Sequence, residues 1–137
     1  MLHKDAKVEA IKRVPLFAKL SKQGLQEIAT IADEIDLPEG KQLTRQGERA
    51  QEFVVLLDGS AEVEQDGRIV NQLGAGDFLG EIGLVTKLPR TATVKTTSSV
   101  RALVITDRDF LELLRHSPDV SAGVLEALGE RLGPELS

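Results

Sequence analysis

The stretch FVVLLDGSAEVEQDG, residues 53–67, decides how this chain folds. It opens with the unbroken apolar run 53–57 and then alternates, with Ala61 and Val63 on one side and glutamates on the other. The first pattern is typical of a fully buried strand and the second of a half-buried strand. Each is followed by an Asp-Gly pair, which marks a tight turn because glycine tolerates a positive φ. The stretch therefore predicts two consecutive hairpins.

Short apolar segments separated by turn residues continue on both sides, which brings the expected number of strands to seven or eight. The apolar positions of these further segments are Ile35, Leu37, Leu43, Ala92, Val94 and 100–105. Regularly spaced short strands are typical of rolled or closed all-β folds. We therefore predict a mainly β fold in which residues 33–106 form a β-roll or double-stranded jelly-roll barrel, with helices at both ends.

The helical periodicity of residues 14–32 predicts a helix in front of the strands. Ser21 is placed to cap this helix, and Leu20 and Leu25 fall at the two hydrophobic-staple positions. Its apolar face consists of Leu25, Ile28, Ala29 and Ala32. Residues 1–13 have only a thin apolar edge and form either a short helix or a linker to a neighbouring part. They lack the apolar core of a signal peptide, and we expect a cytoplasmic protein.

Residues 107–137 are expected to form two helices. Asp107 is placed to cap the first, whose apolar face consists of Phe110, Leu111 and Leu114. Ser117-Pro118-Asp119 predicts the start of the second helix, and Gly133-Pro134 predicts its end. Two internal glycines cost this helix about 1 kcal/mol each relative to alanine. A marginal helix of this kind is either a movable lid or a short helix that packs on the barrel.

Composition narrows the classes of function. The 137 residues include 17 Lys and Arg against 22 Asp and Glu, a net charge of −5, which disfavours direct nucleic-acid binding. The absence of cysteine excludes disulfides, thiolate metal sites and cysteine nucleophiles. The two histidines, His3 and His116, lack ligand spacing, so we predict neither a metal site nor an enzyme. No apolar run approaches the ~20 residues that a membrane span needs.

Residues 76–94, GDFLGEIGLVTKLPRTATV, have the pattern of neither a strand nor an ordinary loop. The glycines let the backbone approach a ligand closely, and a short helical turn would aim free N–H groups at an anion. Arg90 can bind phosphate oxygens as a bidentate fork, and the Thr91 hydroxyl adds a donor. Glu81 can accept a hydrogen bond from a sugar hydroxyl. The residues thus favour a nucleotide site, although Glu81 and Arg90 can also pair with each other.

This segment resembles the phosphate-binding cassette of the cyclic nucleotide-binding domain family, through FLGEIGL at 78–84 and PRTATV at 89–94. The similarity extends over roughly residues 14–132. It implies that Glu81 binds the ribose 2′-hydroxyl and that Arg90 binds the cyclic phosphate. The remaining cassette residues implied to contact the ligand are Phe78, Leu79, Gly80, Ile82, Gly83, Thr91 and Ala92.

The resemblance also implies an apolar wall for the purine and a lid over it. We assign the wall to Val63, Leu73 and Val94 and the lid to the last helix, where Leu125, Leu128 and Arg131 can reach the base. The chain has neither Trp nor Tyr, so an aromatic cap on the base is excluded.

The expected function is that of a regulatory module, not an enzyme, and no cofactor is implied. It binds cAMP, with cGMP as the other candidate ligand, and signals to an unknown output protein or domain by moving its C-terminal helices. We expect one stand-alone domain over residues 1–137 that is a monomer or a weak dimer. The alternative is a ligand-free interaction domain with a vestigial cassette.

Overall fold

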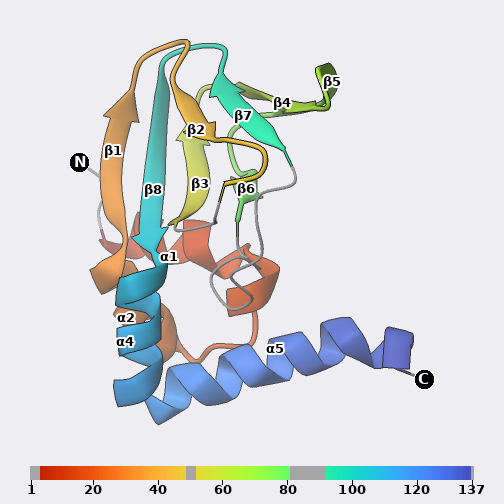
Figure 1. Cartoon of the computed structure of the whole chain (residues 1–137). Coiled ribbons are helices and arrows are strands. Elements are labelled where there is room, and N and C mark those ends of the chain that lie inside the picture. Colours follow the sequence, from red (N-terminus) through yellow and green to blue (C-terminus); the bar gives the residue numbers. More distant parts are fainter. Residues whose placement is uncertain (1–3, 49–51, 81–91, 137) are drawn as a thin grey trace.

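The computed structural model describes residues 4–48, 52–80 and 92–136, with the strands gathered at one end and the helices at the other (Figure 1). The elements in chain order are α1 (Lys4–Lys12), η1 (Pro15–Phe17), α2 (Lys22–Ile31), β1 (Asp33–Leu37), β2 (Gln42–Thr44), β3 (Glu52–Asp58), β4 (Ala61–Gln65), β5 (Arg68–Leu73), β6 (Phe78–Leu79), β7 (Thr93–Thr96), β8 (Val100–Thr106), α4 (Asp107–His116) and α5 (Pro118–Leu136). The predicted mainly β fold with flanking helices is confirmed.

The strands form two four-stranded antiparallel sheets, one in the order β1-β8-β3-β6 and the other in the order β2-β7-β4-β5. The chain crosses repeatedly from one sheet to the other, as expected for the predicted roll. At the outer edge of the first sheet, Arg101 on β8 donates a hydrogen bond from Nε to Oδ1 of Asp36 on β1 at 3.1 Å. This bond and the negative charge of Asp36 raise the pKa of Arg101.

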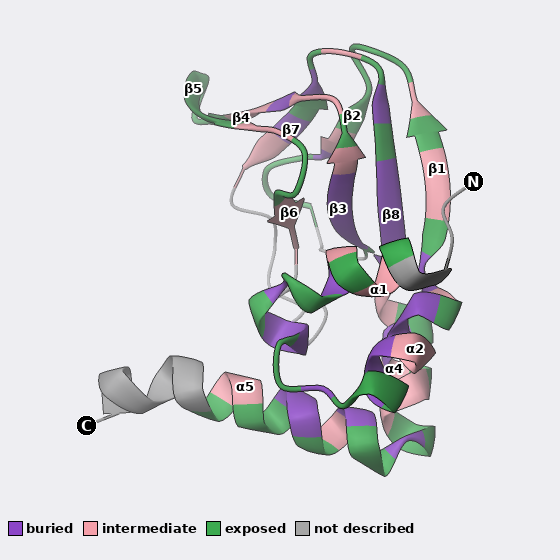
Figure 2. Ribbon diagram, turned by 180° about the vertical axis from the view of Figure 1, so that it is seen from behind, coloured by how far each residue is buried: buried purple, intermediate pink, exposed green. Residues whose placement is uncertain are grey.

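The unbroken apolar run of β3 is explained by burial on both of its faces. Phe53 and Val55 point into a cluster with the helices, whereas Val54 and Leu56 point into a second cluster with the other sheet. Strand β8 divides its side chains in the same way. Figure 2 shows these two strands as the most continuously buried parts of the roll. A strand covered on both faces has no outward side to fill with polar residues, so its sequence does not alternate.

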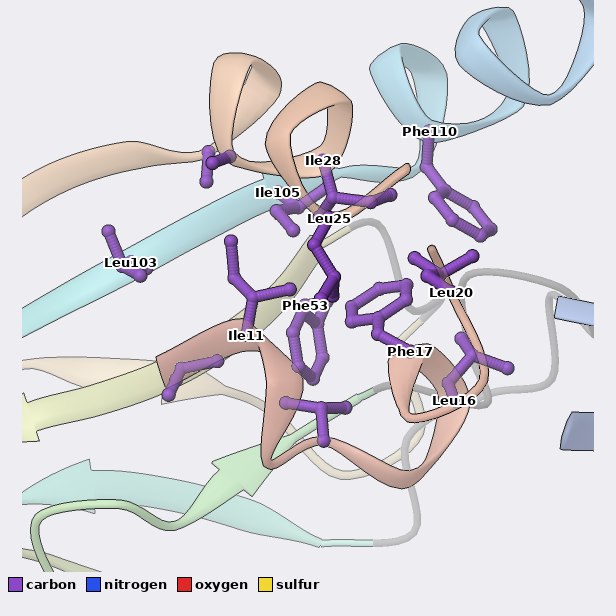
Figure 3. Packing of buried hydrophobic residues seen from close by; sticks show 14 of the residues in the cluster. Ile11, Leu16, Phe17, Leu20, Leu25, Ile28, Phe53, Leu103, Ile105 and Phe110 are labelled. Carbon is purple, nitrogen blue, oxygen red and sulfur yellow. The ribbon is translucent and has the colours of Figure 1, made fainter. Parts of the chain in front are cut away.

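The larger cluster joins the first sheet to the helical layer (Figure 3). Its centre is aromatic: the Phe17 ring lies 5.7 Å from the Phe53 ring in an edge-to-face arrangement and 5.9 Å from the Phe110 ring. All three rings are fully buried. This packing makes η1 and the start of α4 part of the same core as the sheet.

The structure confirms the predicted cap of α2 and shows a helix in the residues before it. The Ser21 hydroxyl caps α2 by accepting a hydrogen bond from the Gly24 amide at 3.0 Å, as predicted. Residues 4–12 form the helix α1, the first of the two predicted alternatives for this segment. The physical reason is Ile11, which is fully buried in the larger cluster. Burial of such a side chain contributes about 1.5–3 kcal/mol and fixes a short helix that is marginal alone.

The C-terminal helices differ from expectation in three details. Thr106, not Asp107, caps α4, because its hydroxyl accepts a hydrogen bond from the Asp109 amide at 3.1 Å. Helix α5 continues to Leu136 instead of ending at Gly133-Pro134. The φ that the proline ring fixes is compatible with a helix, and what the proline removes is one intrahelical hydrogen bond near the helix end. Helix α5 packs mainly on η1, α2 and α4, and thus on the helical layer more than on the barrel.

Candidate functional site

The segment singled out in the sequence begins on the first sheet. Phe78 and Leu79 form the short strand β6, which pairs with β3 and which the sequence pattern does not predict. The pairing arises because these two side chains match the alternation of β3: the Phe78 ring lies 6.1 Å from Phe53 on the helix side, and Leu79 packs on the inter-sheet side. Gly80 follows directly with φ +84°, a conformation that favours glycine.

The turn before β6 is held by Asp77. Its carboxylate accepts a hydrogen bond from the Gly74 amide at 2.8 Å, and its carbonyl accepts one from the Leu56 amide at 2.8 Å. The Gly76 amide in turn donates to the Leu56 carbonyl at 2.8 Å. These bonds fix the approach of the chain to Gly80 against β3.

The segment ends on the second sheet, at residues that sequence reasoning missed. The Thr44 hydroxyl, at the end of β2, donates to the Ala92 carbonyl at 3.0 Å, and the Gln46 amide donates to the Thr93 hydroxyl at 3.0 Å. The register between β2 and β7 shifts after Gln42, and Thr44 is buried. Neither the burial of Thr44 nor the register shift leaves a local pattern in the sequence, in which only Leu43 indicates this strand.

The three predicted wall residues come from adjacent strands of the second sheet. Val63 and Val94 are directly paired across β4 and β7, and Leu73 is paired with Ala61 on the other side of β4. Val63 and Leu73 remain half-exposed while they pack against the inter-sheet cluster. Val94 is only 4% exposed and belongs to the core itself.

The profile of one protein family, described as the cyclic nucleotide-binding domain, matches residues 34–117, from β1 through α4. The chain belongs to this family. Its two sheets and its two C-terminal helices are therefore the β-roll and flanking helices of a cyclic nucleotide-binding domain.

Relatives of this domain occur in proteins of different kinds. A cAMP-dependent protein kinase regulatory subunit of Mycosarcoma maydis is 37% identical over 125 aligned residues, covering 82% of this chain and 22% of the relative. The N-terminal domain of a transcriptional regulator from Streptomyces coelicolor superposes with a TM-score of 0.83 at 27% identity, covering 92% of this chain and 94% of that chain. The regulatory domain of Toxoplasma gondii PKA, crystallised with cAMP, has the same fold, with a TM-score of 0.74 at 24% identity and coverages of 80% and 43%.

The chain spans about a third or less of the length of the curated relatives it matches. The transcriptional-regulator domain, by contrast, matches it over nearly its whole length. The common element is the cyclic nucleotide-binding domain, while the parts to which it is attached differ.

Only some of the predicted cassette residues lie in the described part of the chain. Phe78, Leu79, Gly80 and Ala92 are placed by the contacts given above. The residues Glu81, Ile82, Gly83, Arg90 and Thr91 lie outside the described residues.

The expected lid residues are not gathered at the wall. Leu125 is 67% exposed, and Leu128 is half-buried against the helical cluster. The side chain of Arg131 lies outside the described residues. The C-terminal end of helix α5 points away from the strands and the other helices (Figure 1).

Two further findings concern the described part of the chain alone. Over residues 4–48, 52–80 and 92–136, no three His, Asp or Glu side chains are grouped as metal ligands. Within the same ranges, none of the helices combines the length and the apolar character required to cross a membrane.

Proposed function

We propose that this chain is a regulatory module that binds cAMP in its β-roll. The observation that carries the proposal is the anchoring of the chain at both ends of the cassette, Leu79 on the first sheet and Ala92 on the second. Between these two anchors the sequence holds one glutamate and one arginine, in the order and setting of a phosphate-binding cassette. The chain's membership of the cyclic nucleotide-binding domain family supports the same ligand class.

Each proposed ligand contact follows from the chemistry of the side chain. Arg90 binds the cyclic phosphate through a charge-assisted fork, and Thr91 adds a hydroxyl donor. Glu81 accepts a hydrogen bond from the ribose 2′-hydroxyl. The other cassette contacts come from Phe78, Leu79, Gly80, Ile82, Gly83 and Ala92, chiefly through backbone amides. The purine lies against Val63, Leu73 and Val94.

The choice of cAMP over cGMP has support from two relatives. One is named a cAMP-dependent kinase regulatory subunit, and one structure of the same fold was crystallised with cAMP. Both candidate ligands share the ribose and the cyclic phosphate, so the roles of Glu81 and Arg90 are the same for either. Only the purine contacts differ between them.

The proposed output is a rearrangement of α4 and α5 that is sensed by another protein or by another part of the same protein. For a typical allosteric effect, the ligand must bind one arrangement more tightly than the other by ~1–3 kcal/mol. The module itself is proposed to be a single domain and a monomer or a weak dimer. It makes and breaks no covalent bond.

Calorimetric titration of the purified chain with cAMP and, separately, with cGMP tests the proposal. We expect saturable binding of cAMP with a micromolar or lower Kd, about −8 kcal/mol or better, and weaker binding of cGMP. Arg90→Ala should weaken binding about hundredfold and leave the thermal unfolding midpoint unchanged, since a hydrogen-bonded charge contributes ~1.5–3 kcal/mol.

The control variant is Arg115→Ala, which removes an arginine of α4 whose side chain is 75% exposed. It should bind cAMP like the wild type. No heat and no thermal shift with either nucleotide would overturn the proposal and favour the ligand-free interaction domain. Unchanged affinity in Arg90→Ala would overturn the cassette assignment alone.

A further inference from the structure

The exit of the cassette is tethered by a buried side chain of another strand. Thr44 is only 9% exposed, and its hydroxyl donates to the Ala92 carbonyl at 3.0 Å. In the register of the sheet Thr44 lies opposite Val94, so its side chain reaches back along the chain toward the cassette. A hydrogen bond in a buried setting is better shielded from competing water than one at the surface.

A second hydrogen bond holds Thr93, the residue after Ala92, to the chain just after β2. The Gln46 amide donates to the Thr93 hydroxyl at 3.0 Å. The Gln46 side chain also donates to the Asp66 carboxylate at 2.8 Å and accepts from the Asp66 amide at 3.0 Å. Asp66 lies in the tight turn between β4 and β5 with φ +54°. Thr44 at the end of β2 and Gln46 two residues later thus hold both the chain at the start of β7 and the turn of the hairpin that carries Val63.

We propose that Thr44, assisted by Thr93, is a positioning residue for the phosphate-binding side chains. This inference rests on the proposed function. Ala92 is one residue after Thr91 and two after Arg90, and consecutive Cα atoms are only about 3.8 Å apart. A fixed Ala92 carbonyl therefore limits where the backbone of Arg90 can lie. A bidentate guanidinium fork has a strict geometry, so it benefits from such a fixed origin.

Thr44→Val is the appropriate perturbation, because valine has nearly the shape of threonine and lacks only the hydroxyl. The variant should bind cAMP roughly five- to tenfold more weakly. This is the change in affinity that corresponds to the net contribution of about one hydrogen bond. Thr44→Ser, which keeps the hydroxyl, should restore most of the affinity. Thr93→Val removes the second tether and should weaken binding in the same direction.

Thr96→Val is the matched control on the other end of β7. Thr96 is 2% exposed, and its hydroxyl donates to the Pro38 carbonyl at 2.7 Å and accepts from the Lys41 amide at 2.8 Å. This variant should lower the thermal unfolding midpoint and leave the Kd for cAMP unchanged. It therefore separates loss of stability from loss of positioning.

A double-mutant cycle with Arg90→Ala decides whether Thr44 acts through the arginine. Positioning predicts that Thr44→Val has little further effect once the guanidinium is absent. Fully additive losses, or an affinity loss no larger than that of Thr96→Val, would overturn the inference. If the wild-type chain binds no cyclic nucleotide, the proposed function and this inference fail together. If wild type binds and Thr44→Val binds equally well, only the inference fails.

Discussion

Gly123 provides the most direct test of how α5 is packed. It lies in the first half of the helix, between the buried residues Val120 and Val124. A Cβ atom placed on Gly123 would lie 2.5 Å from Leu20 Cδ2, 3.2 Å from Leu20 Cα and 3.3 Å from the Lys19 carbonyl oxygen. The leucine side chain can turn away, but the two backbone atoms can yield only if the helix moves. The glycine therefore allows α5 to approach the segment between η1 and α2.

The magnitude follows from two opposed effects. Alanine is a better helix former than glycine by about 1 kcal/mol, whereas overpacking costs typically about 1–3 kcal/mol. Gly123→Ala should therefore change the free energy of unfolding by roughly zero to −2 kcal/mol. For Gly129, in the same helix, the described residues place nothing within 4 Å of the position of a Cβ atom. Gly129→Ala should show the helix-forming gain alone, about +1 kcal/mol.

Thermal and urea unfolding of the two variants beside the wild type measure this difference. For a chain of this length 1 kcal/mol corresponds to roughly 3–5 °C in Tm. We expect Gly129→Ala to unfold about 4 °C higher than wild type and Gly123→Ala to unfold at or below the wild-type temperature. If both variants gain equally, α5 does not pack closely on Leu20, and the account of the helical layer given above is refuted.

Three further changes test the cap, the core and the site. Ser21→Ala removes the hydroxyl that accepts from the Gly24 amide and donates to the Asp119 carboxylate, and should lower stability by about 1–2 kcal/mol in urea unfolding; an unchanged midpoint would contradict this. Phe53→Ala should cost about 3–5 kcal/mol by the same measurement, because the ring is fully buried; a loss below 2 kcal/mol would mean the aromatic cluster is not as described. Replacing cAMP by 2′-deoxy-cAMP should weaken binding to the wild type and not to Glu81→Ala, as titration calorimetry can show; an equal loss in both proteins would contradict the ribose contact.

The strands were predictable because their patterns reflect burial directly. The apolar run of β3 and the alternation of β4 result from coverage on two faces and on one face of the sheet, respectively. The Ser21 cap could be predicted equally well, because its hydrogen bond joins residues that are close in sequence. The strand β6 was not predicted, because two residues carry no period and their pairing partner on β3 lies more than 20 residues earlier.

The sequence indicates only part of the candidate site, for a related reason. The residue types that suit a phosphate and a ribose lie within one short segment, so local chemistry sufficed to propose Arg90 and Glu81. Thr44 is 48 residues from Ala92, and its role arises from the register shift between β2 and β7. Long-range register is not encoded in any local pattern, which is why the tether emerged only from the structure.

The packing of α5 also limits how a lid formed by this helix can move. Swinging the whole helix away would expose Val120 and Val124, both nearly fully buried, at about 1.5–3 kcal/mol each. That sum exceeds the ~1–3 kcal/mol that a typical ligand supplies to an allosteric transition. Leu125, by contrast, is already 67% exposed, and in the described part of the chain nothing lies within 4 Å of where a Cβ atom on Gly129 would be. A lid motion that costs little free energy therefore either bends α5 after Val124 or moves η1 and α2 together with α5. In both cases Val120, Gly123 and Val124 keep their contacts.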